Sequence, residues 1–557
     1  MAAGARHGAL GSAIRGQWRR VSASAVLSAL HQATEALVPV LIGLALDEAV
    51  TTGSLARFGS LIVALGAVFL GIALSFRYGA RFGERASYLA AHELRMDLAR
   101  RVLDHRGGAE SGRLPGELVN IATNDAKRVG AANLVLPIGL AACCGLLVAA
   151  GALLRISPQL GSIVLLGTPL LLIVAHLLGK PLERRSDSEQ ERAAQASGTA
   201  ADLVSGLRVL KGIGAVSAAV ERYRDTSRNS LQATVRAAHA KAWHDGGMLV
   251  LTGVLIAVIA LIGGRLAARG EISVGELVAA VGLAQFLLGP LQTFSFVNGE
   301  LALARASAKR IDAVVGSRAA VQAEEAALPE LLRGHLRVRD LTGGPLRGIG
   351  FEVGPGTLTG VVTGDPRVAN ALVDCLSREA DPASGSIELD GRDITTLDIP
   401  QFRAAVLVAA HDADLFEGSL LDNVTAGEQR SGIEASLTAS AADEVVRTLP
   451  EGADTALAER GRSLSGGQRQ RVALARALAA EAPVLVLHDP TTAVDAVTET
   501  RIADGIRSVR SGRTTLLVAT SPVLLAVTDS VVFLDDGAVA THDELLADER
   551  YRSVVLP

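Results

Sequence analysis

The chain has 557 residues and a net charge of −4, which argues against a nucleic-acid-binding surface, because such a surface needs a clustered excess of basic residues. It is too long for one compact domain and suggests two or three. Hydrophobic residues make up 49% and the mean hydropathy is +0.34, yet 20% of the residues are charged, so the apolar residues must be segregated. We expect a membrane domain followed by an α/β domain, and no nucleic-acid partner.

Six apolar segments are long enough to cross ~30 Å of hydrocarbon, which takes about 20 helical residues. These segments are Val21–Leu46, Phe58–Phe76, Ala132–Leu154, Leu160–Leu178, Gly246–Gly264 and Leu277–Val297. The loops after the second and fourth segments are long and rich in arginine. By the positive-inside rule, both long loops and both termini face the cytoplasm. Abundant arginine, alanine and glycine are typical of GC-rich bacterial genomes, so we expect a multi-pass protein of a bacterial cytoplasmic (inner) membrane.

Polar residues within the predicted spans are costly and tend to face a cavity. His31 and Glu35 are four residues apart on one face of the first span, and Gln285, Gln292 and Asn298 occur along the sixth. One hypothesis is a polar substrate path, with His31 and Glu35 as a proton-sensitive pair. The alternative is polar contacts between helices or with a partner subunit, and the sequence favours neither.

The three cysteines predict neither a metal site nor a disulfide. Cys143 and Cys144 are adjacent in an apolar run, and Cys375 lies far along the chain, which gives no metal-ligand spacing. We interpret them as small apolar packing residues.

A strand predicted at residues 358–362 leads into a segment with the spacing of a phosphate-binding loop. In GxxxxGK[ST], glycines let backbone N–H groups close on the phosphates, the lysine neutralises charge, and the Ser/Thr binds Mg²⁺. Gly364 matches the first glycine. The second glycine, the lysine and the Ser/Thr are replaced by Ala369, Asn370 and Ala371. Whether nucleotide docks here stays open, because a helix N-terminus can hold an anion without lysine.

Leu464-Ser465-Gly466-Gly467-Gln468 precedes a basic, alanine-rich segment and resembles the LSGGQ signature of ATP-binding cassette (ABC) transporters. In that family the signature contacts ATP held by the other cassette of a dimer, where a helix N-terminus favours the γ-phosphate. The resemblance therefore implies four residues that face the partner's ATP, namely Ser465, Gly466, Gly467 and Gln468.

The order of segments resembles the exporter-type ABC fold over nearly the whole chain. The resemblance implies an α-helical membrane domain with six transmembrane helices at residues 1–312. A linker at 313–333 and an α/β P-loop-type nucleotide-binding domain at 334–557 follow.

Four further positions of this chain's own nucleotide site differ from the family pattern. After an apolar strand, His488 stands at the position of the metal-proximal aspartate, and Asp489 stands at that of the catalytic glutamate. His411 replaces the Q-loop glutamine, and Thr520 replaces the switch histidine. We interpret this as a degenerate site that cannot hydrolyse ATP. The alternative is a misalignment, with Asp489 as the metal-binding aspartate, which would require several motifs to be misplaced together.

Symmetry predicts the assembly. Asp495 resembles the D-loop aspartate, which communicates across a cassette dimer. A C₂ homodimer would pair each whole signature with a degenerate phosphate loop and leave two inactive sites. A heterodimer would instead have one competent site. The sequence thus predicts a second half-transporter with intact Walker A and Walker B motifs, ATP and Mg²⁺ mainly at the partner's site, and no ATPase activity from the isolated chain.

The predicted function is transport of a substrate across the membrane by this ATP-hydrolysing pair, with export as the default direction. The sequence leaves the substrate open. It also leaves two alternatives, which are a siderophore-type importer with the exporter fold and a non-transporting regulatory subunit.

Overall fold

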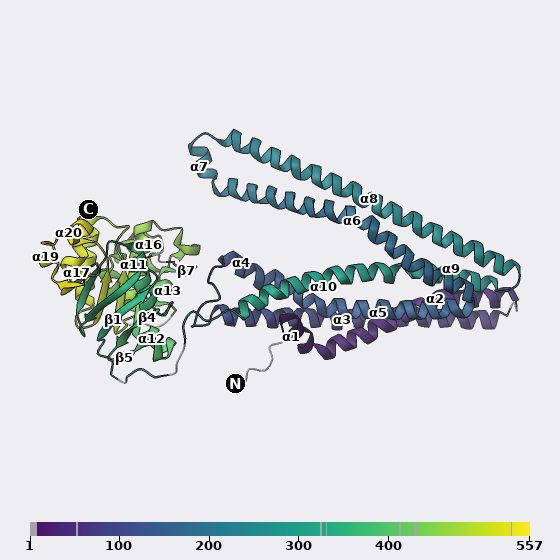
Figure 1. Cartoon of the computed structure of the whole chain (residues 1–557), viewed down its shortest axis with the longest axis horizontal. Helices are drawn as coiled ribbons and strands as arrows, with labels where there is room; N and C mark the ends of the chain where they lie inside the picture. The colour runs from purple at the N-terminus through teal and green to yellow at the C-terminus, as the bar shows by residue number, and fades with distance from the viewer. Residues whose placement is uncertain are drawn as a thin grey trace. The chain divides into compact units, whose positions relative to one another are not determined.

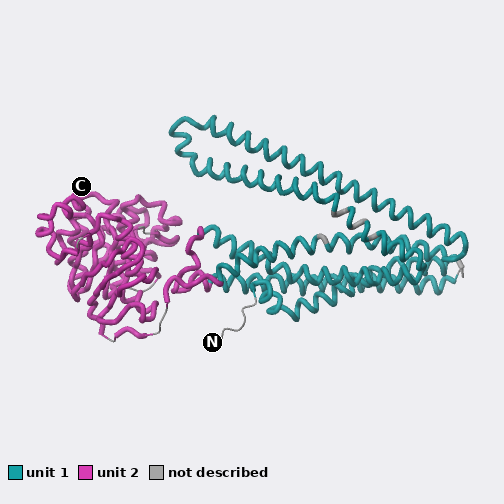
Figure 2. The backbone as a smooth tube through the Cα atoms, in the orientation of Figure 1, with its two compact units in different colours: residues 1–99, 115–315 teal, residues 100–114, 316–557 magenta. Residues whose placement is uncertain are grey.

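The computed structural model describes residues 8–51, 54–322, 326–329, 331–411, 414–427, 432–535 and 537–556. The chain divides into two compact units, which Figure 2 distinguishes by colour. The first comprises residues 1–99 and 115–315, and the second comprises residues 100–114 and 316–557. The first unit is helical and the second is α/β, so the predicted fold class is confirmed.

The first unit is built from long helices. They are α1 (Ala9–Gly16), α2 (Trp18–Thr51), α3 (Leu55–Val102), α4 (Pro115–Asn120), α5 (Ala126–Ile156), α6 (Pro158–Ser205), α7 (Leu207–Gly212), α8 (Val216–Ala268), α9 (Val274–Phe286) and α10 (Leu288–Val315). A π-helical turn, Ile121–Asp125, connects α4 to α5. Helix α10 ends at Val315, inside the segment that the sequence predicts as the linker.

Each of the six predicted spans lies within a helix or a pair of successive helices. A search of the described residues by length and composition finds four helical segments that could cross a membrane, which are α3, α4 with α5, α8, and α9 with α10. These four carry the second, third, fifth and sixth predicted spans. The first and fourth predicted spans lie in α2 and α6, and the apolar stretch found in α6 is the shorter Pro158–Gly167.

Small residues allow close backbone approach between helices of the first unit. Gly43 of α2 faces Gly275 of α9, and a Cβ atom on either glycine would collide with the carbonyl oxygen of the other. Gly130 of α5 approaches the backbone of Ser87 of α3 in the same way. Contacts of this kind let membrane helices associate through van der Waals packing where no hydrophobic driving force exists.

Helices α6 and α8 lie side by side and are joined at one end through α7 (Figure 1). They contain 48 and 53 residues. At 1.5 Å per residue, each is more than twice as long as the ~30 Å hydrocarbon layer of a membrane. Both helices must therefore continue beyond the membrane, as the sequence predicts for its second long loop.

Residues 100–114 belong to the second unit although α3 and α4 of the first unit flank them. The N–H groups of Ala320 and Val321 both donate to the carbonyl oxygen of Arg106, at 3.0 and 3.2 Å. The guanidinium of Arg101 donates to the carbonyl oxygen of Gly107 at 3.0 Å. Backbone hydrogen bonds thus fasten this short excursion to the segment that leads into the α/β domain.

The second unit contains two main sheets and a two-stranded ribbon. Its strands are β1 (Leu336–Gly343), β2 (Leu346–Val353), β3 (Leu358–Val362), β4 (Ser384–Leu389), β5 (Arg392–Asp393), β6 (Val406–Ala409), β7 (Gly418–Ser419), β8 (Ala456–Leu457), β9 (Val484–His488), β10 (Thr514–Val518), β11 (Ser530–Phe533) and β12 (Ala538–Ala540). The larger sheet has the order β12-β11-β3-β10-β9-β6, in which only β12 is antiparallel to its neighbour. The antiparallel sheet has the order β2-β1-β4-β5.

Helices pack around these sheets. They are α11 (Pro366–Leu376), α12 (Ile399–Ala405), α13 (Leu420–Thr425), α14 (Ile433–Ala439), α15 (Ala442–Thr448), α16 (Gly466–Ala479), α17 (Ala496–Val509), α18 (Pro522–Ala526), α19 (His542–Leu545) and α20 (Glu549–Val555). Short 3₁₀ turns lie at Ile394–Thr396, Gly452–Asp454 and Glu459–Gly461. The central strands β3, β9 and β10 are fully buried and apolar apart from Thr359, Thr514, Thr515 and His488. This pattern is expected for a parallel sheet that is covered on both faces.

Candidate nucleotide-binding site

The positions that the sequence analysis interprets as degenerate follow the carboxyl ends of neighbouring parallel strands. Strands β6, β9 and β10 are followed by His411, Asp489 and Thr520, and β3 is followed by residues 363–365. Carboxyl ends of parallel strands share one edge of the sheet, where open α/β sheets bind their ligands. The structure therefore places the predicted residues along one edge, although they are dispersed in the sequence.

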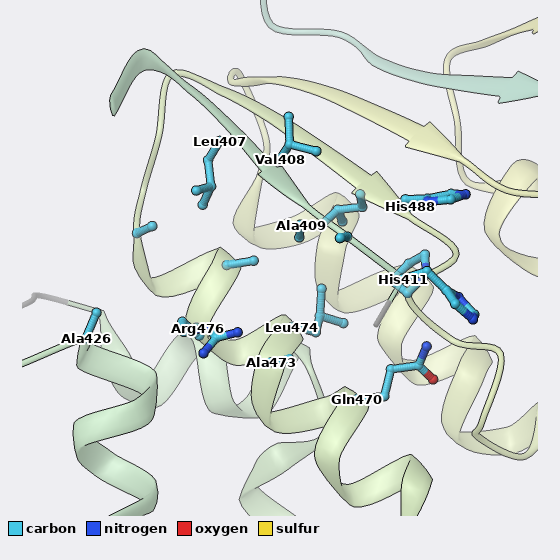
Figure 3. Close-up of a pocket in the computed structure, with 15 residues that line it drawn as sticks. Leu407, Val408, Ala409, His411, Ala426, Gln470, Ala473, Leu474, Arg476 and His488 are labelled. Atoms are coloured by element: carbon cyan, nitrogen blue, oxygen red, sulfur yellow. The ribbon is translucent and has the colours of Figure 1, made fainter. Parts of the chain in front are cut away.

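His411 and His488 lie close together at this edge. Their ring centroids are 6.0 Å apart, and both side chains flank the same cavity in Figure 3. His488 is 8% exposed, and burial lowers its pKa, which favours the uncharged ring. The carboxylate of Asp489 is 3.8 Å from its Nε2 atom. A neutral ring thus stands where the family pattern has the charged aspartate beside the metal ion.

The phosphate-loop position is a helix N-terminus with almost no loop before it. Strand β3 ends at Val362, and α11 begins at Pro366. Ala369, Asn370 and Ala371 therefore lie inside α11, where Asn370 is exposed. In a phosphate loop the residues before the second glycine form a cradle of backbone N–H groups, and here helix takes their place.

Asp365 is the N-cap of α11. Its Oδ1 atom accepts from the N–H of Arg367 at 2.9 Å, and the Arg367 guanidinium forms an ion pair with the same carboxylate at 2.8 Å. The hydrogen bond from this guanidinium is the main cause that lowers the pKa of Asp365. The carboxylate therefore stays charged at neutral pH.

A second carboxylate lies on the other side of Gly364. The Thr363 hydroxyl donates to Asp535 at 3.1 Å. A Cβ atom on Gly364 would lie 3.4 Å from the other Asp535 oxygen and 3.3 Å from Val554 of α20. Gly364 is exposed, and a carboxylate and the C-terminal helix lie beside it.

No lysine occurs after Lys309 in the sequence. The lysines are Lys127, Lys180, Lys211, Lys241 and Lys309. A shifted alignment cannot supply the missing phosphate-loop lysine, because residues 310–557 contain none. The other alternative, Asp489 as the metal-binding aspartate, does not depend on this lysine.

The signature lies at the N-terminus of α16. Ser465 is the N-cap, and it forms a capping box in which its Oγ atom accepts from the N–H of Gln468 and its N–H donates to the Gln468 side chain. In the described part of the chain, no acceptor takes the N–H of Gly466 or of Gly467. Two adjacent donors at a helix N-terminus are therefore open to an external anion.

Gly467 packs directly against the segment that contains the predicted D-loop. A Cβ atom at this position would lie 2.5 Å from the carbonyl oxygen of Ala493, so a larger residue requires the backbone to move. Asp495, two residues further on, is the N-cap of α17 and accepts from the N–H groups of Val497 and Thr498. Glycine at 467 thus allows the signature to lie against this loop.

Gln470 is a site residue that the sequence analysis missed. Its Nε2 atom donates to the Asp489 carbonyl at 2.9 Å and to the Thr492 hydroxyl at 3.0 Å. Its Oε1 atom accepts from the N–H of Ala493 at 2.9 Å. One side chain, 9% exposed, therefore links the signature helix to the end of β9 and to the following loop.

Two cavities border α16. One of about 370 Å³ is lined by β6, β9 and α16, including His411, His488, Gln470 and Arg476 (Figure 3). The other, of about 520 Å³, lies beside the signature and is lined by three arginines, Arg460, Arg462 and Arg469, with Asp414 as its acidic residue. The signature thus faces a positively charged space, whereas the phosphate-loop position is flanked by carboxylates.

The polar residues of the membrane unit form separate groups. His31 Nε2 is 3.7 Å from Glu35, and its Nδ1 is 3.1 Å from the Ile72 carbonyl. Gln292 and Asn298 line a cavity of about 1130 Å³ between α6, α8 and α10. Gln285 is exposed. Among the described residues, no cluster of three or more His, Cys, Asp or Glu side chains is arranged to hold a metal ion.

Long apolar helices joined to an α/β domain with a signature helix define a membrane transporter with a nucleotide-binding cassette. Family models match at two places, the ABC transporter transmembrane region at residues 21–291 and the ABC transporter cassette at residues 346–492. The chain belongs to the ABC transporter family.

Known relatives cover nearly the whole chain. Over 94% of its own length, the chain is 31% identical to a multidrug efflux ATP-binding/permease protein of Mycobacterium tuberculosis. The match spans only 45% of that relative. The chain is 26% identical to an ATP-dependent lipid A-core flippase of Thiobacillus denitrificans, over 98% of this chain and 96% of the flippase. A solved bacterial Atm1-family ABC exporter with ATP bound has the same fold, with a TM-score of 0.78, 23% identity, and coverage of 97% and 98% of the two chains.

Proposed function

We propose that this chain is one half of a heterodimeric ABC exporter of a bacterial cytoplasmic membrane, with both termini in the cytoplasm. It contributes the N-terminus of α16 to a nucleotide site whose phosphate loop, metal ligand and catalytic carboxylate belong to a second half-transporter. ATP hydrolysis with Mg²⁺ takes place at that shared site. Residues 1–312 supply the membrane path, residues 313–333 the linker, and residues 334–557 the cassette.

The contrast within one cassette carries this proposal. The signature is whole and presents two open N–H donors, Gly466 and Gly467. The phosphate-loop position begins its helix at Pro366, and no lysine follows residue 309. A homodimer repeats the same surfaces, so each of its two sites would combine a whole signature with a defective phosphate loop. A partner with an intact loop is the arrangement that yields a working site.

The membrane unit supports an amphipathic substrate. The 1130 Å³ cavity combines apolar side chains, such as Met248, Leu291 and Phe294, with Lys180 and Glu183. The two relatives are named for efflux of drugs and for flipping of a lipid, which agrees with export of an amphiphile. Gln292 and Asn298 are then polar contacts on the path.

His31 and Glu35 form the second polar element of the proposed path. Replacing both by leucine tests it, and the expected result is altered substrate stimulation of the ATPase activity of the pair. Unchanged stimulation would assign the two residues to contacts between helices.

The decisive experiment is co-purification with the candidate partner, followed by ATPase assay. We expect Ser465→Ala to reduce the activity of the pair at least ~10-fold, and a Walker B substitution in the partner to abolish it. Thr541→Ala is the matched control, because Thr541 forms the same capping box at α19, which packs against α18. Its cap loss of ~1 kcal/mol should leave the activity within about twofold. Full activity of Ser465→Ala, or ordinary ATPase activity from this chain alone, would overturn the proposal.

A further inference from the structure

We infer that this cassette's own phosphate-loop position holds no nucleotide, because the Asp365 carboxylate already occupies the anion-binding end of α11. The closed pair would then contain one ATP. This inference rests on the proposed heterodimer and deepens it, since it concerns occupancy of the second site rather than hydrolysis at the first.

The backbone donors of this helix end are already used. Pro366 has no N–H, and the N–H of Arg367 donates to the Asp365 side chain at 2.9 Å. The N–H groups of Val368 and Ala369 donate to the Asp365 carbonyl at 2.9 and 3.3 Å. The N–H of Asp365 itself donates to the Thr363 hydroxyl at 3.3 Å. From Asp365 to Ala369, therefore, every backbone N–H has an acceptor within the chain, and a phosphate would have to displace one.

The charges also oppose a triphosphate. Asp365 and Asp535 flank Gly364, and the guanidinium of Arg367 is already paired with Asp365 through Nη2 at 2.8 Å and Nε at 3.1 Å. An incoming phosphate would meet two carboxylates and one neutralised cation. The Asp365 carboxylate already interacts with the positive end of the helix dipole, which leaves less attraction for an incoming anion.

The space around Gly364 is only partly filled. The C-terminal helix α20 reaches this glycine through Val554, which would lie 3.3 Å from a Cβ atom there. Gly364 itself is exposed, so steric crowding alone does not keep a phosphate from its backbone. Hydrogen bonding and charge therefore carry the inference.

Nucleotide counting tests the inference directly. The pair is purified with the partner's catalytic carboxylate replaced by glutamine, loaded with MgATP, freed of excess nucleotide, and examined by native mass spectrometry. We expect one ATP per pair and 8-azido-ATP labelling on the partner only. Two ATP molecules per pair would overturn this inference, and they would leave the heterodimer intact if the same pair with the unsubstituted partner shows ATPase activity. Failure to co-purify would instead remove the heterodimer.

Two variants test whether the Asp365 carboxylate is the group that keeps nucleotide from the N-terminus of α11. Asp365→Ala should increase 8-azido-ATP labelling of this chain at least ~5-fold, because it frees the Arg367 N–H and removes a charge. Asp365→Asn, which keeps the cap, should give a smaller increase. Asp548→Ala is the matched control, since Asp548 caps α20 and pairs with Arg550 in the same Asp-x-Arg geometry. Equal labelling of Asp365→Ala and Asp548→Ala would overturn the assignment.

Discussion

The N-termini of α11 and α16, two helices of the same cassette, differ in whether they can bind an anion, although both follow a capping residue. Helix α16 has a neutral serine cap and two glycines whose N–H groups are open. Helix α11 has a charged aspartate cap, a proline with no N–H and an arginine whose N–H is already used. The difference teaches that a helix dipole makes an anion site only when its cap is neutral and its first-turn donors are free.

The largest effect on this contrast is expected from a substitution at the N-terminus of α16, where two N–H donors are open. Gly467→Ala would place a Cβ atom 2.5 Å from the Ala493 carbonyl oxygen, so the signature must shift away from the partner's phosphate. We expect a fall on the order of 100-fold in the ATPase activity of the pair, comparable with the loss of a donor to a developing charge.

The control for this variant is Gly505→Ala. Its Cβ atom would collide with the Ala439 carbonyl oxygen, far along α17 from the signature. It should lower the melting temperature but preserve the specific activity of the folded pair. Equal activity losses in Gly467→Ala and Gly505→Ala would mean that crowding, rather than the signature, determines the result.

Gln470→Leu should have the next largest effect. The variant removes three hydrogen bonds that connect α16 to Asp489, Thr492 and Ala493. It leaves the part-buried N–H of Ala493 and carbonyl of Asp489 without this partner, a cost of about 1 kcal/mol. We expect about a 10-fold lower ATPase activity of the pair and a lower melting temperature. Gln401→Leu, at an exposed glutamine that accepts one weak hydrogen bond at 3.4 Å, should change neither.

The sequence could predict the fold class and the position of each motif, because hydropathy and strand–loop order are local properties. It could not predict Gln470, whose partners lie about 20 residues away and approach only through tertiary packing. Nor could it predict that residues 100–114 are hydrogen-bonded to residues 320 and 321. The start of α11 had a local signal, since Asp365-Pro366 is a good N-cap and first-turn pair. The phosphate-loop alignment did not use this signal, because it matches residue spacing and takes no account of where a helix begins.

A smaller effect is expected from pH, through His488 at the carboxyl end of β9. Burial lowers the pKa of His488 below 6.5, the ordinary value of a histidine side chain, so the unfolded chain binds a proton more readily than the folded chain. The stability contributed by the neutral ring is fully present above pH 6.5 and is lost as the pH falls below that value. We expect thermal unfolding of the full chain to show a loss of stability on acidification that is reduced in His488→Gln. Identical pH profiles would mean that His488 is equally protonated in both states.

The smallest effect should come from restoring the missing side chains alone. Asn370→Lys with Ala371→Ser recreates the lysine and the metal-binding hydroxyl of a phosphate loop, yet we expect no gain in ATPase activity or 8-azido-ATP labelling of this chain. Asn370 projects from within α11 rather than from a loop, and the N–H groups from Asp365 to Ala369 remain engaged. Adding Asp365→Gly and Pro366→Ser to the same variant should raise labelling, because these changes free the backbone. If the double substitution alone restored labelling, side-chain composition would outweigh the helix start, and the contrast between α11 and α16 would lose its physical basis.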